Sequence, residues 1–184
     1  MVNEMKIILA SNSARRKEIL TEHNILFECI PSNVDEKIDT KLNVLENVMN
    51  LARQKCMDVY QNNSSEIVLA ADTIVVFNNK IYGKPKDEDD AFRMLKTLSG
   101  NTHEVITGVA VGKNGNINTS YEISKVTFKN MSNEEILDYI KTKEPMDKAG
   151  SYAIQGIGNK FILSYEGEFD NIVGLPMKLV KKML

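Results

Sequence analysis

Residues 67–82 read IVLAADTIVVFNNKIY, and this stretch determines the centre of the fold. Its first part, Ile67–Phe77, is rich in Ile and Val and predicts a buried β-strand. The pair Asn78 and Asn79 predicts a two-residue hairpin turn, because Asn tolerates the positive φ angles that such turns need. The chain is therefore expected to return as an antiparallel strand that begins at Lys80.

One acidic residue, Asp72, interrupts this strand. A carboxylate that is buried without a partner is costly, so Asp72 requires a metal ion, a cation or hydrogen-bond donors. We take Phe77 and Lys80 as the pair that closes the turn, and the register then places Lys84 opposite Thr73 and beside Asp72. Opposed residues share a face, so direct contact between Lys84 and Asp72 requires a bulge or a strand end. A strand-end aspartate paired with Lys84 is the structural alternative to a functional carboxylate.

The chain before the hairpin predicts a strand, a polar loop, a helix, a weaker strand and a long amphipathic helix. These segments are, in that order, Lys6–Ala10, Ser11–Ser13, Arg15–His23, Phe27–Pro31 and Val44–Tyr60. In the last of them the apolar residues fall on one arc, and Lys55 lies inside that arc. The Lys55 side chain therefore either extends along its stem to solvent or points into a cleft beside the core.

The chain after the hairpin predicts two helices, a second hairpin, a short strand and a terminal helix. Acids at Asp87–Asp90 precede a helix whose core face is Ala91, Met94, Leu95 and Leu98, and the terminal helix follows Pro176. The strands Val105–Val111 and Ile117–Phe128 flank the turn at Asn114 and Gly115. A capping box of Ser132 and Glu135 opens a helix to about Lys143, and a short strand lies near Phe161–Leu163. Together these elements predict a mixed α/β fold in a single domain over residues 1–184.

The composition narrows the class of protein. A chain of 184 residues with 42% hydrophobic and 26% charged residues is typical of a globular domain. The net charge of −2 provides no basic field for a nucleic-acid polymer, and no apolar run approaches the ~20 residues of a membrane helix. Cys29 and Cys56 stand alone, and the N-terminal residues show no secretion signal. We therefore expect a cytoplasmic protein.

The polar loop after the first strand is a candidate phosphate site. Ser11 and Ser13 offer hydroxyl groups and backbone N–H groups at a helix N-terminus, and Arg15 and Arg16 follow in the first helical turn. The structural alternative is an ordinary N-cap by Ser13 with two solvated arginines.

Two further features suggest ligand chemistry. Glu36 and Asp72 could share a divalent cation through oxygen ligands, the arrangement that Mg²⁺ prefers when it also holds phosphates. His23 and His103 have no ligand-like spacing, so both are expected to be structural or exposed. Residues 147–158 combine glycines with the amide of Gln155, which can read a base edge, although a glycine-rich turn is the alternative.

Several segments in order along the chain resemble the Maf family of nucleoside triphosphate pyrophosphatases. They are Ser11–Leu20, Ala71–Thr73, Gly83–Pro85, Leu98–Gly100, His103–Val109, Glu144–Gly150, Ile154–Gly156 and Val173–Pro176. The resemblance covers nearly the whole chain. One departure is Ala14, where the family usually has a proline that pre-sets the first helical turn.

The resemblance implies a fold of the Maf and inosine-triphosphatase type, with an elongated mixed sheet and flanking helices around a central cleft. It also implies hydrolysis between the α- and β-phosphates with a divalent metal, Mg²⁺ or Mn²⁺, and it makes a homodimer plausible. By the same resemblance Asp72 matches the catalytic acid, and Glu36, Lys55 and Lys84 match charged cleft positions. The set Arg15, Thr73 and Gln155 is typical of family members that act on dTTP and UTP.

The resulting hypothesis is metal-assisted release of pyrophosphate from dTTP, UTP or modified pyrimidine triphosphates, which removes non-standard nucleotides. Glu36 and Asp72 would hold the metal, and Asp72 would orient or deprotonate water. Lys55, Lys84 and Arg16 would neutralise charge on the phosphates. The alternative is a nucleotide-binding regulator of cell division and septum formation.

Overall fold

The computed structural model describes residues 6–184, and these residues form one sheet of seven strands flanked by helices. The strands are β1 (Ile7–Leu9), β2 (Phe27–Cys29), β3 (Ile67–Phe77), β4 (Lys80–Tyr82), β5 (Thr102–Lys113), β6 (Asn116–Phe128) and β7 (Ile162–Glu166). Their order is β2, β1, β3, β5, β6, β7, with β4 paired to β3. β1 pairs parallel with β2 and β3, whereas β4 and β7 pair antiparallel with β3 and β6. The predicted mixed α/β class is confirmed.

The helices occur where amphipathic patterns and caps predict them, with short additions. The α-helices are α1 (Ala14–Glu22), α2 (Val44–Tyr60), α3 (Glu88–Leu98), α4 (Asn133–Lys141), α5 (Phe169–Val173) and α6 (Met177–Met183). The 3₁₀ turns are η1 (Glu144–Asp147), η2 (Ala149–Ser151) and η3 (Ile157–Phe161). In the described range, 6–184, no helix is long and apolar enough to cross a membrane. The N-terminal segment on which the expected absence of a secretion signal depends begins outside the described residues.

The chain forms two compact units. The first unit contains residues up to Asp72, then Thr107–Glu122 and Gly174–Leu184, and the second contains Thr73–Ile106 and Ile123–Val173. The chain passes from one unit to the other inside β3, β5 and β6, and again between α5 and α6. The expectation that residues 1–184 act as one domain stays a prediction.

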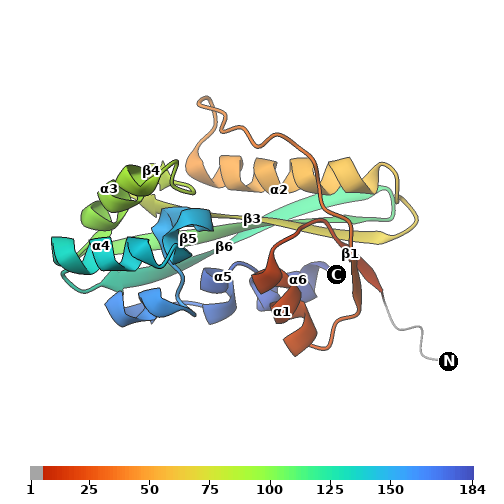
Figure 1. The fold of residues 1–184 in the computed structure, drawn as a ribbon. Helices are drawn as coiled ribbons and strands as arrows, with labels where there is room; N and C mark the ends of the chain where they lie inside the picture. Colours follow the sequence, from red (N-terminus) through yellow and green to blue (C-terminus); the bar gives the residue numbers. More distant parts are fainter. Residues whose placement is uncertain (1–5) are drawn as a thin grey trace. The chain divides into compact units, whose positions relative to one another are not determined.

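In the first unit α2 covers the sheet. Figure 1 shows α2 along one side of the strands of this unit, with α1 and α6 on the other side. The core cluster between α2 and the sheet combines residues of the helix with residues of the strands: Ile8, Ala10, Ala52, Cys56, Val59, Tyr60, Val68, Ala70 and Ala110. Gly108 of β5 allows the helix to lie close, because a Cβ there would be 2.3 Å from the Val48 carbonyl oxygen. The predicted helix and its apolar arc are confirmed.

The second unit has its own core. α3 packs against α4, and the predicted core face of α3 (Ala91, Met94, Leu95 and Leu98) is buried. His103, Phe128 and Tyr152 form a cluster of edge-to-face rings with centroids 4.7–5.3 Å apart. The Nε2 atom of His103 lies 2.6 Å from the Tyr152 hydroxyl oxygen, and burial lowers the pKa of His103 to about 4. His103 is therefore a structural residue, in agreement with the prediction.

The first hairpin has the predicted turn but a shorter second strand. Phe77 pairs with Lys80, and Val75 pairs with Tyr82, in the predicted register. Pairing stops there, because β4 ends at Tyr82 and Lys84 lies on the exposed chain beyond it. The predicted pairing of Lys84 with Thr73 is therefore wrong. β3 runs unbroken through Thr73, and it is β4 that ends before Lys84.

The helices α1, α2 and α4 begin at side-chain caps, and those of α1 and α4 use the predicted residues. Asn43 and Glu46 form a capping box at α2, and Ser132 and Glu135 form the predicted one at α4. Ser13 caps α1 by accepting a hydrogen bond from the Arg16 backbone N–H. α4 ends at Lys141, two residues before the predicted end, and Lys143 takes a left-handed φ of 64° that a helix cannot continue through.

Candidate active site

Lys55 joins two carboxylates in the first unit. Its Nζ lies 2.7 Å from Asp72 Oδ1 and 2.9 Å from Glu36 Oε1. The Lys55 and Asp72 side chains are 13% and 10% exposed, whereas that of Glu36 is half exposed. Lys55 therefore does not extend to solvent, and the partner of Asp72 in this unit is Lys55.

Asp72 reaches this position through the packing of β3. The residues before it, Val68–Ala71, are buried, and Asp72, counted as a whole residue with its backbone, is 7% exposed. Because Lys55 is on the core-facing side of α2, the helix brings the cation to the strand that carries the acid. A buried carboxylate is tolerated when a hydrogen-bonded cation compensates it, as Lys55 does here.

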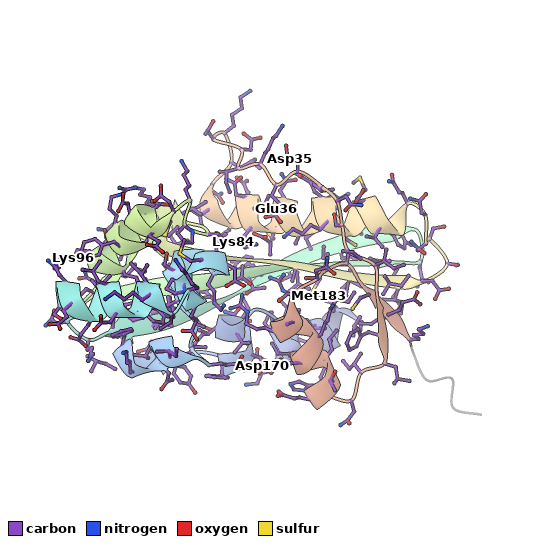
Figure 2. The ribbon with its side chains drawn as sticks, viewed as in Figure 1. Asp35, Glu36, Lys84, Lys96, Asp170 and Met183 are labelled. Atoms are coloured by element: carbon purple, nitrogen blue, oxygen red, sulfur yellow. The ribbon has the colours of Figure 1, made fainter. Side chains whose placement is uncertain are left out.

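The segment that carries Glu36 has no regular structure and is held by two polar side chains of α2. The Asp58 carboxylate accepts hydrogen bonds from the Ser32 hydroxyl at 3.0 Å and from the Asn33 backbone N–H at 2.9 Å. Asn47, which is buried, accepts from the Asp39 backbone N–H and donates to the Asp39 carbonyl. Figure 2 shows Glu36 on this segment beside α2. Glu36 thus lies between two fixed points of the chain.

The Ser11 to Ser13 loop is an ordered helix entry. The Ser11 hydroxyl accepts from the Ser13 backbone N–H at 3.1 Å and from an Arg16 guanidinium nitrogen at 3.5 Å. Arg16 Nε donates to the Gly174 carbonyl oxygen at 2.8 Å. The N-cap by Ser13 is therefore present, but Arg16 is anchored by the protein rather than only solvated.

Electrostatics links this loop to the acids. The pKa of the Arg16 guanidinium is lowered, mainly by burial. The charge of Asp72 is the next largest influence and raises it, while Arg15 lowers it and Glu36 raises it by less. The guanidinium thus lies in the field of both carboxylates that contact Lys55. This cluster, defined as Arg16, Glu36, Lys55 and Asp72, has two acids and two cations, and we call it the charge cluster.

The other predicted residues have separate surroundings. Arg15 is half-buried in the first turn of α1. Thr73, Lys84 and Gln155 belong to the second unit, where Thr73 is half-buried in β3 and Lys84 and Gln155 are exposed. The convergence of these three residues with the charge cluster stays a prediction.

A polar network around Gln155 is not predicted from the sequence. The Glu144 carboxylate accepts from the backbone N–H groups of Ile157 and Gly158, at 2.9 and 3.0 Å, and from the Tyr139 hydroxyl. Glu144 belongs to a segment used for the family resemblance, but no property of that segment alone assigns it a partner. The only sign of this role in the sequence is the glycine at position 156. The structure explains that glycine, because a Cβ there would lie 1.7 Å from Glu144 Oε1.

Glu36 and Asp72 could bind one divalent ion that takes only two of its ligands from the protein. Among the described residues no group of three or more His, Cys, Asp or Glu side chains could hold a metal. Glu36 and Asp72 supply two carboxylates, which is the number Mg²⁺ uses when water and substrate phosphates complete its coordination. An ion here must displace the Lys55 ammonium or use the carboxylate oxygens that Lys55 leaves.

Comparisons of the sequence with known proteins agree on one family. The family model described as Maf-like protein matches residues 6–184. A dTTP/UTP pyrophosphatase of Caldicellulosiruptor bescii is 50% identical over 97% of this chain and 93% of its own length. A dTTP/UTP pyrophosphatase of Bacillus cereus is 49% identical over 97% of this chain and 94% of its own length. The solved structure of the Staphylococcus aureus Ham1 protein has a TM-score of 0.50 at 12% identity over 97% of each chain, a likeness of fold alone.

Proposed function

The chain belongs to the Maf-like protein family, and from this membership we propose that it hydrolyses dTTP and UTP to the nucleoside monophosphate and pyrophosphate. The observation that carries the proposal is the contact of Lys55 with both Glu36 and Asp72. Acids and cations gathered at a partly buried point are what phosphoryl transfer requires, because its catalysis consists mainly of positioning and charge stabilisation.

Asp72 is assigned the role of general base. Its carboxylate, on β3, is held by the Lys55 ammonium, so it can accept a proton from an attacking water or orient that water by a hydrogen bond.

The cations are assigned to the phosphates. Lys55 would exchange part of its contact with the acids for contact with phosphate oxygens, and Arg16 would present a guanidinium fixed through its Nε. Lys84 is proposed as a third cation, supported by the family resemblance. Ser11 and Ser13 would donate hydroxyl hydrogens to phosphate oxygens while keeping their acceptor roles in the loop.

A divalent cation, Mg²⁺ or Mn²⁺, is part of the proposal, and Glu36 and Asp72 would hold it. When bound, such an ion neutralises phosphate charge and polarises the phosphoryl oxygen. Arg15, Thr73 and Gln155 are proposed to select the pyrimidine base. The resemblance also supports a homodimer, which analytical ultracentrifugation tests, and the free thiols of Cys29 and Cys56 support a reducing, cytoplasmic location.

The test is pyrophosphate release from a panel of normal and modified nucleoside triphosphates, with Mg²⁺ or Mn²⁺. We expect release from dTTP and UTP, and equal kcat/KM for GTP and UTP would contradict the proposed preference. Modified pyrimidine triphosphates in the panel decide whether the preferred substrate is a non-standard nucleotide. Binding of UTP without release of pyrophosphate would support the regulator of cell division instead, which the names of the relatives do not favour.

Asp72→Asn is the decisive variant. It keeps the shape of the side chain but removes the base, so kcat should fall by about 10²- to 10⁴-fold while the protein remains folded. Asp138→Asn is the matched control, because Asp138 is an exposed acid of α4 that pairs with Lys141. Turnover of Asp72→Asn close to that of the control would refute the assignment.

A further inference from the structure

The segment Ala153–Gly158 is tied to one polar cluster on both sides of Gln155. After Gln155, Glu144 Oε1 accepts from the Ile157 N–H at 2.9 Å and Oε2 accepts from the Gly158 N–H at 3.0 Å. Before Gln155, the Ala153 backbone N–H donates to the Tyr139 hydroxyl oxygen at 3.2 Å. The Tyr139 hydroxyl in turn donates to Glu144 Oε2. Two side chains therefore fix the backbone on both sides of a single residue.

The cluster is set by the core of the second unit. Tyr139 is fully buried on α4, and its ring lies edge-on to that of Phe161 at 5.2 Å between centroids. Gly156 lets the Glu144 carboxylate press against the backbone next to Gln155, since a Cβ at that position would overlap Oε1. The position of the segment thus depends on packed groups rather than on solvent contacts.

Gln155 is the exposed point of this fixed segment. Ile154 before it is buried, and the Ile154 carbonyl accepts from the Asn159 side-chain amide at 3.0 Å. Gly156 after it is half-buried, whereas Gln155 is exposed. The fold therefore presents one primary amide outward from a backbone that is hydrogen-bonded at Ala153, Ile154 and Ile157.

The charge state of the cluster agrees with this geometry. Burial alone would raise the pKa of Glu144, but hydrogen bonds from Tyr139, Gly158 and Ile157 and the charge of Lys148 lower it overall. Burial and the bond to Glu144 raise the pKa of Tyr139. Glu144 is therefore an ionised acceptor and Tyr139 a protonated donor at neutral pH.

We infer that Glu144 and Tyr139 are positioning residues that hold the Gln155 amide in place and thereby set the preference for pyrimidine over purine triphosphates. The inference rests on the proposed function, in which Gln155 reads the base. Discrimination through a hydrogen-bonding group depends on its placement, because a displaced amide leaves the base and the protein with unpaired polar atoms.

Glu144→Gln tests the inference. Glutamine offers one acceptor oxygen where glutamate offers two, so its NH₂ group must face a backbone N–H of Ile157 or Gly158. We expect the ratio of kcat/KM for UTP to that for GTP to fall by about tenfold, the factor associated with one charged hydrogen bond. Amide hydrogen exchange of Ile157 and Gly158 should become faster in the same variant.

Two further variants keep the test sharp if Glu144→Gln loses stability. Tyr139→Phe removes the hydroxyl that links Ala153 to Glu144 while keeping the ring, and it should lower the same ratio. Glu135→Gln is the matched control, because Glu135 caps α4 and pairs with Lys129 without contacting the segment. The control should keep the UTP preference even where its melting temperature falls.

A double-mutant cycle separates positioning from general destabilisation. In a Gln155→Ala background, Glu144→Gln should change the UTP to GTP ratio no further, because the group that it positions is gone. Additive effects, or equal loss for UTP and GTP, would overturn the inference. If the wild-type protein releases no pyrophosphate from any nucleotide, the proposed function and the claim about base preference fail together. The exchange rates at Ile157 and Gly158 then still decide whether Glu144 holds the segment.

Discussion

At the residue scale, one ammonium group contacts two carboxylates. The Lys55 and Asp72 side chains are largely buried, and the half-exposed Glu36 carboxylate contacts Lys55 from the solvent side. The periodicity of α2 identifies Lys55 as unusual but leaves its direction open, since a long side chain can reach solvent from a core-facing position. The tertiary contact with β3 decides between the two, and helix periodicity does not contain it.

Lys55→Met should destabilise the protein, because it leaves the buried Asp72 carboxylate without its cation. Removal of one partner of a buried pair costs about 3 kcal/mol in the free energy of unfolding. Lys37→Met is the control, since the Lys37 and Asp35 side chains are 79% and 84% exposed and such pairs contribute about 1 kcal/mol at most. Urea unfolding of both variants measures the difference, and equal stability would contradict a structural role for Lys55.

His103 should make stability depend on pH. Burial lowers its pKa from 6.5 to about 4, so between these pH values the unfolded chain binds more protons than the folded one. The free energy of unfolding should therefore fall as the pH drops through this window, by up to about 3 kcal/mol from this residue alone. In His103→Gln, which does not titrate, urea unfolding at pH 7 and pH 4.5 should show a smaller loss. An unchanged loss would show that His103 is not the group responsible.

At the element scale, α2 positions the charge cluster because it lies directly on β5. Gly108→Ala would place a methyl group 2.3 Å from the Val48 carbonyl oxygen, and backbone cannot move aside as a side chain can. We expect a loss of about 1–3 kcal/mol in stability, together with lower pyrophosphate release as Lys55 is displaced. Gly83→Ala is the control, because a Cβ at that glycine has nothing within 4 Å. Thermal unfolding and turnover of both variants test this, and a neutral Gly108→Ala would contradict the close approach.

Elements with local signals are predictable from the sequence, and elements made by distant contacts are not. The turn at Asn78 and Asn79 and the capping box at Ser132 depend on neighbouring residues, and both are present as predicted. The short helix α5 and the 3₁₀ turns have no period long enough to detect. In the site, Asp72 is identifiable as an acid within an apolar run, whereas the role of Glu144 depends on residues more than a helical turn away.

At the scale of the whole molecule, the chain divides the proposed functional residues between its two units. β3 carries Asp72 as the last residue of its segment of the first unit and Thr73 as the first residue of the second. The charge cluster, however, is complete within the first unit. Its two acids and two cations balance one another, so the first unit does not depend on an added ion for charge compensation.

Removal of metal should therefore abolish activity without unfolding the protein. With EDTA, pyrophosphate release should be lost, because Lys55 and Arg16 are already balanced by Glu36 and Asp72 and leave no net positive charge for the phosphates. The melting temperature should change by less than about 2 °C, since Lys55 and Arg16 already balance the two carboxylates, and 1 kcal/mol corresponds to about 2–4 °C for a protein of this size. In Lys55→Met, Mg²⁺ should raise the melting temperature more than in the wild type, because the ion then supplies the missing compensation. A large drop for the metal-free wild-type protein would show that the ion, rather than Lys55, holds these acids together.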